Sequence, residues 1–253
     1  MSSSGKKWAL VTGAGKQRVG FHVARALGRI GYSLILHYRN SAVEAEESAQ
    51  ILGQEGMEAL LVQAELAEEP EVDRVMAFLR QHCGRLDTLV TCASTWQPKK
   101  LEQTTAEDYL QAFRANVLST ALIAQKAGLW MTSQPTGGCI VTVGDWAVTR
   151  PYPEYAAYHT SKGSIPVLTR ALAVELGRRN PKVRVNCVEP GPVMLPPDLS
   201  PEEREEAIGA TLVQREGTPE HVAQAVLALV ENEFITGVCL PVDGGRSIWA
   251  LNR

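Results

Sequence analysis

Short apolar runs alternate with longer amphipathic segments along almost the whole chain, and this alternation limits the folds that it can adopt. Most of the short runs are nearly continuously apolar, which is typical of parallel strands covered on both faces. The predicted strands are Trp8–Thr12, Ser33–Tyr38, Ala59–Gln63, Thr88–Cys92, Cys139–Val143, Val183–Val188 and Val238–Val242. The predicted helices are Gly20–Ile30, Ala42–Glu55, Pro70–His82, Ala106–Thr132, Tyr155–Arg179 and Pro219–Val230. The pattern predicts an α/β fold: one doubly wound domain with a seven-stranded parallel sheet flanked by helices.

One irregular stretch interrupts the alternation after the sixth strand. It runs from Pro190 to about Gly217 and contains Pro192, Pro196, Pro197 and a charged segment, Pro201–Glu206. A loop of that length in a compact domain is more often functional than an idle connection. We therefore expect a substrate lid at about residues 192–218. No internal repeat or linker divides the sequence, so we expect one domain over residues 1–253.

Composition and charge exclude several classes of partner. The net charge is −3 without acidic or basic blocks, which argues against nucleic acid or a membrane surface as a partner. No apolar run is long enough for a membrane span, and the N-terminus lacks the apolar region of a signal peptide, so we expect a cytoplasmic protein. The five cysteines form no C-x-x-C pair, and we expect reduced, mostly buried thiols and no metal site.

A glycine-rich turn, Thr12–Gly20, joins the first predicted strand to the first predicted helix. Glycines there let the backbone turn tightly and bring amide groups close to a pyrophosphate at the helix N-terminus. Such a turn is weak support alone, because many turns contain glycines. Its place between the first strand and the first helix is where Rossmann-type dinucleotide-binding folds have it.

The end of the second predicted strand indicates which dinucleotide binds. This stretch, residues 37–41, carries Arg39 and no acidic residue. An acidic residue there accepts from the ribose 2′-OH of NAD, whereas an arginine accommodates the 2′-phosphate of NADP. With Ser41 and Arg18 as further donors, we favour NADP(H). The alternative is that Arg39 is a solvated residue at a helix start.

Tyr158 and Lys162 lie four residues apart in a predicted helix, which places both side chains on one face. A lysine there can lower the pKa of the tyrosine and hold the nicotinamide ribose, so that the phenol exchanges a proton with substrate near neutral pH. This spacing is common by chance, and the rest of the chain must support it.

With these pieces in order, the chain resembles the short-chain dehydrogenases/reductases over nearly its whole length. The matching pieces are Thr12–Gly20, Asn116, Tyr158 with Lys162, Val185-Asn186, Pro190-Gly191-Pro192 and Pro241–Gly245. The resemblance implies Tyr158 as proton donor, Lys162 as its partner and Asn116 as support for a proton-relay water. The cofactor-binding residues that it implies are Gly13, Lys16, Arg18, Val19, Tyr38, Arg39, Asn40, Ser41, Glu65, Leu66, Ala93, Ser94, Asn116, Tyr158, Lys162, Pro190, Gly191 and Val193.

Departures from the family pattern suggest a branch within it. The glycine turn is one residue longer than usual, and the family's catalytic serine, thirteen residues before the tyrosine, is here Asp145. An aspartate at that place is similar to the pteridine reductases, including dihydromonapterin (dihydrofolate) reductases. That resemblance implies a substrate site of Ser94, Trp96, Asp145 and Tyr158, in which the indole stacks on the substrate and Asp145 hydrogen-bonds Tyr158.

Three functions follow as hypotheses. The first is an NADPH-dependent reductase of a pterin or similar flat heterocycle, with Tyr158, Lys162 and Asp145 handling protons. The second is a carbonyl/alcohol oxidoreductase of the same family, with a 3-oxoacyl, sugar or steroid-like substrate. In that enzyme Asp145 takes the serine's structural place and caps the turn at Trp146, and Trp96 is loop packing. The third is an inactive cofactor-binding scaffold, against which the intact Tyr158, Lys162 and Asn116 argue.

The resemblance also implies an assembly. The family is usually tetrameric through its long central helices and its last strand, so we expect a homotetramer acting on a small molecule. We further expect that the tail, Ser247–Leu251, covers a neighbouring subunit. Of the remaining reactive side chains, His159 is expected to be a bystander and Cys92 a small residue under the cofactor.

Overall fold

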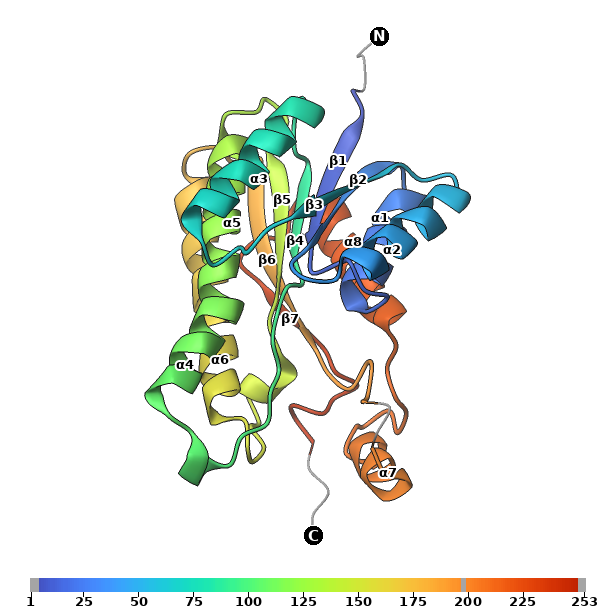
Figure 1. Ribbon diagram of the computed structural model, residues 1–253, viewed down its shortest axis with the longest axis vertical. Helices are drawn as coiled ribbons and strands as arrows, with labels where there is room; N and C mark the ends of the chain where they lie inside the picture. Colours follow the sequence, from blue (N-terminus) through green and yellow to red (C-terminus); the bar gives the residue numbers. More distant parts are fainter. Residues whose placement is uncertain (1–4, 197–198, 250–253) are drawn as a thin grey trace.

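A parallel sheet of seven strands runs through the middle of the molecule (Figure 1). The structure is a computed structural model that describes residues 5–196 and 199–249. The strand order is β3-β2-β1-β4-β5-β6-β7, and all six neighbouring pairs are parallel. The strands are β1 Lys7–Thr12, β2 Tyr32–Tyr38, β3 Ala59–Gln63, β4 Thr88–Thr91, β5 Gly138–Val143, β6 Val183–Pro190 and β7 Cys239–Val242. Each predicted strand is present, and the predicted fold class is confirmed.

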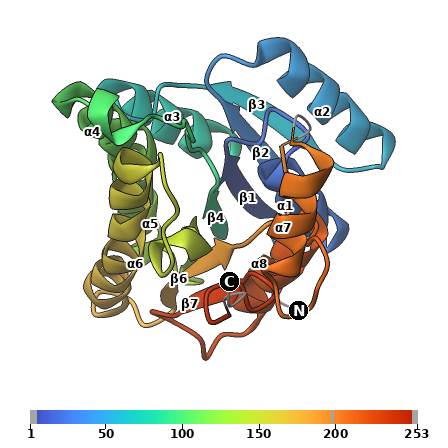
Figure 2. The same cartoon turned by 90° about the horizontal axis from the view of Figure 1, so that it is seen from below.

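Helices cover both faces of the sheet, as the continuously apolar strands require (Figures 1 and 2). One face packs against α1 Val19–Arg29, α2 Ala42–Gln54 and α8 Pro219–Glu231. The other face packs against α3 Glu69–His82, α5 Ser119–Thr132 and α6 Ala156–Gly177. Each face therefore has its own apolar core, and strands such as β1 and β2 are buried from both sides.

The direction in which the chain adds new strands to the sheet changes between β1 and β4. From β1 the chain builds β2 and β3 on one side, and from β4 it builds the remaining strands on the other. In open α/β sheets such a switch point leaves a crevice at the carboxyl ends of the strands, where ligands bind. The fold thus fixes one edge of the sheet as the place for a site.

The helix predicted over Ala106–Thr132 is present without a break, but a π-helical segment interrupts its α-helical geometry. The structure has α4 Ala106–Phe113, a π-helical segment Arg114–Leu118 and then α5. The π-helical segment carries Asn116, whose side chain is buried and bonded to a neighbouring loop rather than to its own helix. Single π-turns inside helices are often found at functional sites. An apolar periodicity cannot reveal them because it continues through the segment.

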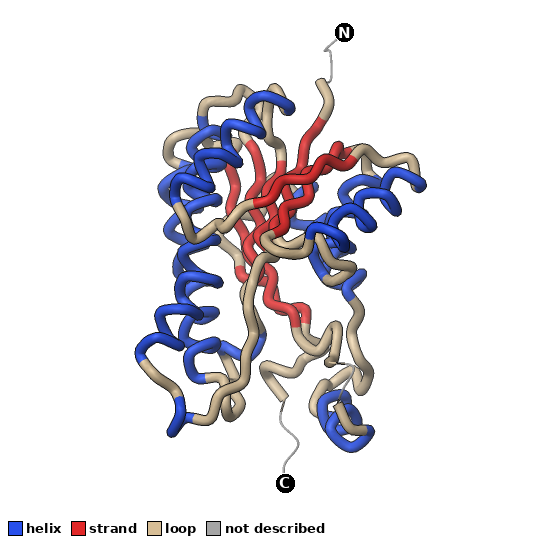
Figure 3. Tube along the Cα trace, viewed as in Figure 1, coloured by secondary structure: helices blue, strands red, loops and turns tan. Residues whose placement is uncertain are grey.

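The predicted lid contains a helix that the sequence did not predict, α7 Pro201–Gly209 (Figure 3). Ser200 and Glu203 form a capping box at its start, which explains why a short, charged segment is helical. Arg204 pairs with Glu216, which also accepts a hydrogen bond from the backbone of Leu195. These bonds join both ends of the predicted lid. Of that segment, residues 197–198 lie outside the described residues.

Within the described part of the chain, none of the helices combines the length and the apolar character needed to cross a bilayer. The five cysteines are free thiols, as expected, with three buried and two partly exposed.

Candidate active site

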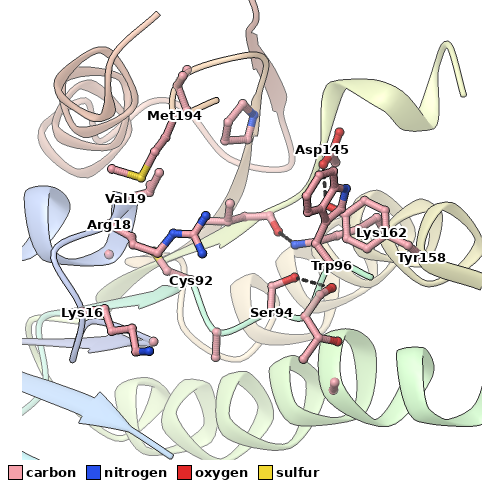
Figure 4. A pocket seen from close by; sticks show the side chains of 18 of the residues that line it. Lys16, Arg18, Val19, Cys92, Ser94, Trp96, Asp145, Tyr158, Lys162 and Met194 are labelled. Carbon is pink, nitrogen blue, oxygen red and sulfur yellow. Dashed lines mark hydrogen bonds between the residues drawn. The ribbon is translucent and has the colours of Figure 1, made fainter. Parts of the chain in front are cut away.

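A cleft of about 920 Å³ opens at the carboxyl ends of the strands. Its lining comes from the loops that follow β1 to β6, so the site is assembled from segments far apart in the sequence. All the predicted cofactor-binding, catalytic and substrate-binding residues lie in the described part of the chain, and every one except Asn116 lines this cleft. Figure 4 shows Lys16 and Arg18 on one side and Asp145, Tyr158 and Lys162 on the other.

The glycines of the β1–α1 turn have no room for a side chain. Gly13 has a φ of +65°, and a Cβ there would lie 2.7 Å from Cα of Ala93. A Cβ on Gly15 would lie 2.7 Å from Cβ of Tyr38. The turn is therefore pressed against the ends of β2 and β4, and its backbone faces the cleft. This close approach suits a phosphate-binding turn despite its extra residue.

His37 fixes this turn from beneath. Its Nδ1 accepts a hydrogen bond from the backbone N–H of Gly13 at 3.2 Å, so its Nε2 carries the proton and donates to the carbonyl oxygen of Ala64 at 3.1 Å. The ring is buried, and burial lowers its pKa to about 4. The imidazole is therefore neutral, as its acceptor role requires. Sequence reasoning missed His37, although its place at the end of the second predicted strand was visible.

The basic residues expected to bind phosphate are paired with carboxylates. Arg39 lies 3.1 Å from Glu65, and Lys16 lies 3.1 Å from Glu44. All four side chains are substantially exposed, and exposed ion pairs contribute about 1 kcal/mol or less. A bound phosphate can therefore replace either carboxylate at small cost.

Asp145 both caps a turn and accepts a hydrogen bond from Tyr158, the predicted proton donor. It follows β5, and its Oδ1 accepts from the backbone N–H of Ala147 at 2.8 Å, which caps the short 3₁₀ helix Trp146–Val148. Its Oδ2 accepts from the hydroxyl of Tyr158 at 2.5 Å. Two roles that the sequence left as alternatives are filled at the same time, one by each oxygen.

The net pKa of Tyr158 is raised, although the Tyr–Lys spacing led us to expect that it is lowered. Burial first, and then the charge of Asp145 and its hydrogen bond, raise the pKa of the phenol well above its usual value. Lys162 is itself buried, its Nζ donates to the carbonyl oxygen of Val143 at 2.9 Å, and burial lowers its pKa. Tyr158 therefore keeps its proton at neutral pH and is placed to donate it.

Asn116 does not line the cleft itself but hydrogen-bonds residues that do. Its Oδ1 accepts from the hydroxyl of Ser94 at 2.9 Å and from the backbone N–H of Thr95 at 2.8 Å. Its Nδ2 donates to the carbonyl oxygen of Thr95 and to the hydroxyl of Ser161. These bonds tie the loop after β4 to α6, so Asn116 positions both Ser94 and the helix that carries Tyr158.

Four aromatic side chains form a wall of the cleft, of which the sequence analysis predicted only Trp96. This aromatic wall consists of Trp96, Trp146, Tyr152 and Tyr155. The Trp96 ring stacks on Tyr155 at 4.8 Å, and its Nε1 donates to the hydroxyl of Tyr152 at 3.1 Å. Trp96 nevertheless remains 45% exposed. The close spacing of aromatic residues just before Tyr158 was the signal that could have revealed the wall.

Two further side chains behave as expected. Cys92 lines the cleft, but burial raises the pKa of its thiol to about 12, which makes it a poor nucleophile. His159 does not line the cleft. Its ring packs edge-on against Tyr152 with centroids 4.6 Å apart, and its Nε2 is buried without a hydrogen-bond partner in the described structure.

Comparison with known proteins identifies the family. A family model described as enoyl-(acyl carrier protein) reductase matches residues 13–247. The chain belongs to the short-chain dehydrogenase/reductase family. It is 33% identical to the human 3-oxoacyl-[acyl-carrier-protein] reductase over 235 residues, which cover 92% of this chain and 95% of that protein. This chain is thus an oxidoreductase of that family.

Two further similarities span the whole family domain. The chain is 30% identical to the hydroxynaphthalene reductase-like protein Arp2 of Metarhizium anisopliae, with 94% of each protein covered. Its fold is similar to a crystal structure of acetoin dehydrogenase from Enterobacter cloacae, with a TM-score of 0.87, 25% identity and 98% of each chain covered. The reductases of this family use NAD(P)(H), which agrees with the glycine turn and the cleft.

The contact between His37 and Gly13 predicts an acid-sensitive turn. Because the pKa of His37 is about 4 in the folded protein and about 6.5 when it is unfolded, the stability gained from the neutral ring is complete above pH 6.5. It is lost as the pH falls from 6.5 to 4, by about 3 kcal/mol. Between pH 6.5 and pH 4, we expect the free energy of unfolding to fall by about 3 kcal/mol more in the wild type than in His37→Gln. Equal pH dependence in urea titrations of the two proteins would contradict this account.

Proposed function

We propose that this protein is an NADPH-dependent reductase of a flat heterocyclic substrate, most simply a pterin. The observation that carries the proposal is the hydrogen bond between Tyr158 and Asp145 in a cleft with an aromatic wall. A carboxylate in place of a serine beside the catalytic tyrosine suits substrates whose ring nitrogens need protons. The proposal rests on these contacts and on the resemblance of Asp145 and Trp96 to the pteridine reductases.

The residues of the cleft fit a dinucleotide. Gly13 and Gly15 leave the turn bare for a pyrophosphate, and Lys162 is the cation that would hold the nicotinamide ribose. Arg39, at the end of β2, would bind a 2′-phosphate in exchange for Glu65. NADPH, when bound, supplies the hydride. Preference for NADPH over NADH remains part of the proposal.

The chain's own residues handle the proton. The raised pKa of Tyr158 keeps the phenol protonated, so it can give its proton to the nitrogen or oxygen of the reduced bond. Asp145 accepts the hydrogen bond that the Tyr158 hydroxyl donates. Asp145 also lines the cleft, so after the transfer a proton can return from the cleft to the phenolate. Buried Lys162 stabilises the phenolate while it lasts.

The aromatic wall supports a flat substrate. Indole and phenol rings favour offset or edge-on contact with another ring, and Trp96 has an exposed fraction large enough to meet one. A relative named as a hydroxynaphthalene reductase-like protein agrees with a ring-shaped substrate. Ser94, held by Asn116, would contact both cofactor and substrate.

A second candidate is a carbonyl/alcohol oxidoreductase with a 3-oxoacyl, sugar or steroid-like substrate. The specific observation in its favour is the set of relatives, which includes a 3-oxoacyl-[acyl-carrier-protein] reductase and an acetoin dehydrogenase. The capping bond of Asp145 to Ala147 is equally compatible with it. The two candidates share the cofactor and Tyr158 and differ in what Asp145 does.

The homotetramer and the cytoplasmic location expected from the sequence stay predictions. Exposed apolar side chains on α4 and α6, such as Leu110, Phe113, Val167 and Val174, offer a surface that a second copy would cover. The expected subunit-covering tail reaches beyond Trp249, and residues 250–251 lie outside the described residues.

The first prediction of the proposal concerns Asp145. In Asp145→Ser, we expect NADPH oxidation with dihydrobiopterin or dihydrofolate to fall by roughly a hundredfold, because the proton route to the ring is lost. Oxidation with an acetoacetyl thioester should stay or rise. Steady-state rates with the three substrates, measured in parallel on wild type and variant, check this. A wild type that prefers the thioester, and a variant that keeps that activity, would favour the second candidate.

The second prediction concerns the proton donor. Tyr158→Phe should lower kcat about a hundredfold or more on whichever substrate is turned over, while the Kd for NADPH stays within a few fold. Tyr109→Phe, an exposed tyrosine on α4, serves as the control and should leave both quantities unchanged. Unchanged turnover in Tyr158→Phe would exclude Tyr158 as the proton donor, and a wild type that turns over none of the three substrates would favour the inactive scaffold.

The third prediction concerns the cofactor. Arg39→Ala should weaken NADPH binding at least about tenfold, because a charge-assisted hydrogen bond is lost, and should leave NADH binding nearly unchanged. Glu65→Gln, which removes the competing carboxylate, should leave NADPH binding equal or tighter. Fluorescence titration of both cofactors measures this. An equal loss for NADH and NADPH would assign Arg39 no part in the choice.

A further inference from the structure

Two cysteines that are far apart in the sequence face each other at the edge of the sheet. Cys187 on β6 and Cys239 on β7 are direct partners in the parallel register. Side chains of opposed residues in a parallel pair point to the same face, and residues two apart on one strand do so as well. Glu189 therefore lies on that face beside Cys187. The two sulfur atoms and a carboxylate oxygen all lie within 4.8 Å of one another.

The carboxylate of Glu189 has no partner in the described structure. The residue is only 8% exposed, yet its side chain makes no hydrogen bond and no ion pair within 4 Å in this part of the chain. Neither of its oxygens is among the fully buried polar atoms that lack a partner in the described residues, so water or an ion can reach the carboxylate. The positive charge of Arg170 on α6 acts on it electrostatically without direct contact. Something that the described residues do not supply would complete this group.

The backbone of Gly144 packs closely against the cluster: a Cβ at this position would come within 3.1 Å of Sγ of Cys187 and 3.2 Å of Cγ of Glu189. The cluster is separate from the reaction site, because none of its three members lines the cofactor cleft. It nevertheless lies on β6 just before Pro190 and Gly191, which do line it.

We propose that Cys187, Glu189 and Cys239 bind a thiophilic divalent cation, with Zn²⁺ as the best match. Thiolate sulfur and carboxylate oxygen are both Zn²⁺ ligands, and tetrahedral bonds of about 2.3 Å place two sulfurs about 3.8 Å apart, within the observed limit. Two thiolates and a carboxylate are neutralised by a divalent cation together with the guanidinium of Arg170. Three protein ligands leave the fourth position to water.

A bound cation would link the edge strand β7 to β6, because its ligands come from both strands. A cation that binds the folded protein and not the unfolded chain stabilises the fold by mass action. The proposal departs from the expectation that the cysteines bind no metal. That expectation considered spacing along the chain, whereas these ligands are brought together by strand register.

Titration of the metal-free, reduced protein with Co²⁺ tests the proposal, because Co²⁺ bound by thiolates gives a charge-transfer absorption band. We expect one Co²⁺ per chain, displacement by Zn²⁺, and a Tm that rises with Zn²⁺. Cys239→Ser and Glu189→Gln should each bind Co²⁺ at least about 10- to 100-fold more weakly than the wild type. Metal sites lose that much affinity even when only a residue that hydrogen-bonds a ligand is removed. Cys139→Ser, a buried strand cysteine on the other face, is the matched control and should bind like the wild type.

Several results would overturn the proposal. The first is that the reduced wild type binds neither Co²⁺ nor Zn²⁺, while air oxidation removes the thiols of Cys187 and Cys239 together. That result would show that the two cysteines form a disulfide and not a metal site. Another is a band that weakens equally in Cys139→Ser. Unchanged affinity in Glu189→Gln would remove the carboxylate from the ligand set. Because that variant keeps the side chain's shape, circular dichroism and NADPH binding can show that it is folded.

Discussion

Parallel strands that are buried on both faces force every connection to cross back over the sheet, and in this protein all seven strands obey that constraint. Their carboxyl ends consequently meet at one edge, where the turn after β1, the end of β2 and the loops after β4, β5 and β6 face a common cleft. The close approach of Gly13 to Ala93 depends on this arrangement, because it needs β1 and β4 to be neighbours. The cofactor site and the catalytic site are thus consequences of one topology.

Within that cleft, electrostatics separates the roles of three titratable side chains. Burial keeps Tyr158 protonated, and the hydrogen bond to Asp145 strengthens this effect. Lys162 donates a hydrogen bond to the carbonyl oxygen of Val143. Its positive charge favours the phenolate form of Tyr158, whereas the negative charge of Asp145 disfavours that form. A phenol between these two influences is a reluctant acid whose proton leaves only toward a substrate that gains negative charge. That arrangement suits reduction better than it suits abstraction of a proton from an alcohol.

Local patterns in the sequence predicted much of this, and tertiary contacts decided the remainder. The strands and most helices follow from apolar runs, and Asp145, Tyr158 and Lys162 follow from their spacing and the family resemblance. The π-helical segment at Asn116 depends on bonds to Thr95, a residue in another loop. The cysteine cluster depends on the register of β6 and β7. The pKa of Tyr158 was predicted with the wrong sign because burial, which the motif does not encode, outweighs the lysine.

The substrate is selected at the part of the cleft where the family motifs give no guidance. Relatives whose names point to an acyl chain and to a ring have similar identities to this chain, 33% and 30%, so overall similarity does not distinguish the two kinds of substrate. The distinction must come from side chains beyond Tyr158, and here these are four aromatic rings together with Arg246, whose guanidinium lies 4.7 Å over Trp146. Under the proposed function, a planar heterocycle would stack on the exposed part of Trp96, which is 45% exposed, and place a ring nitrogen near Tyr158. The proposed preference for a ring therefore depends on the aromatic wall, whereas the proton chemistry depends on the burial of Tyr158.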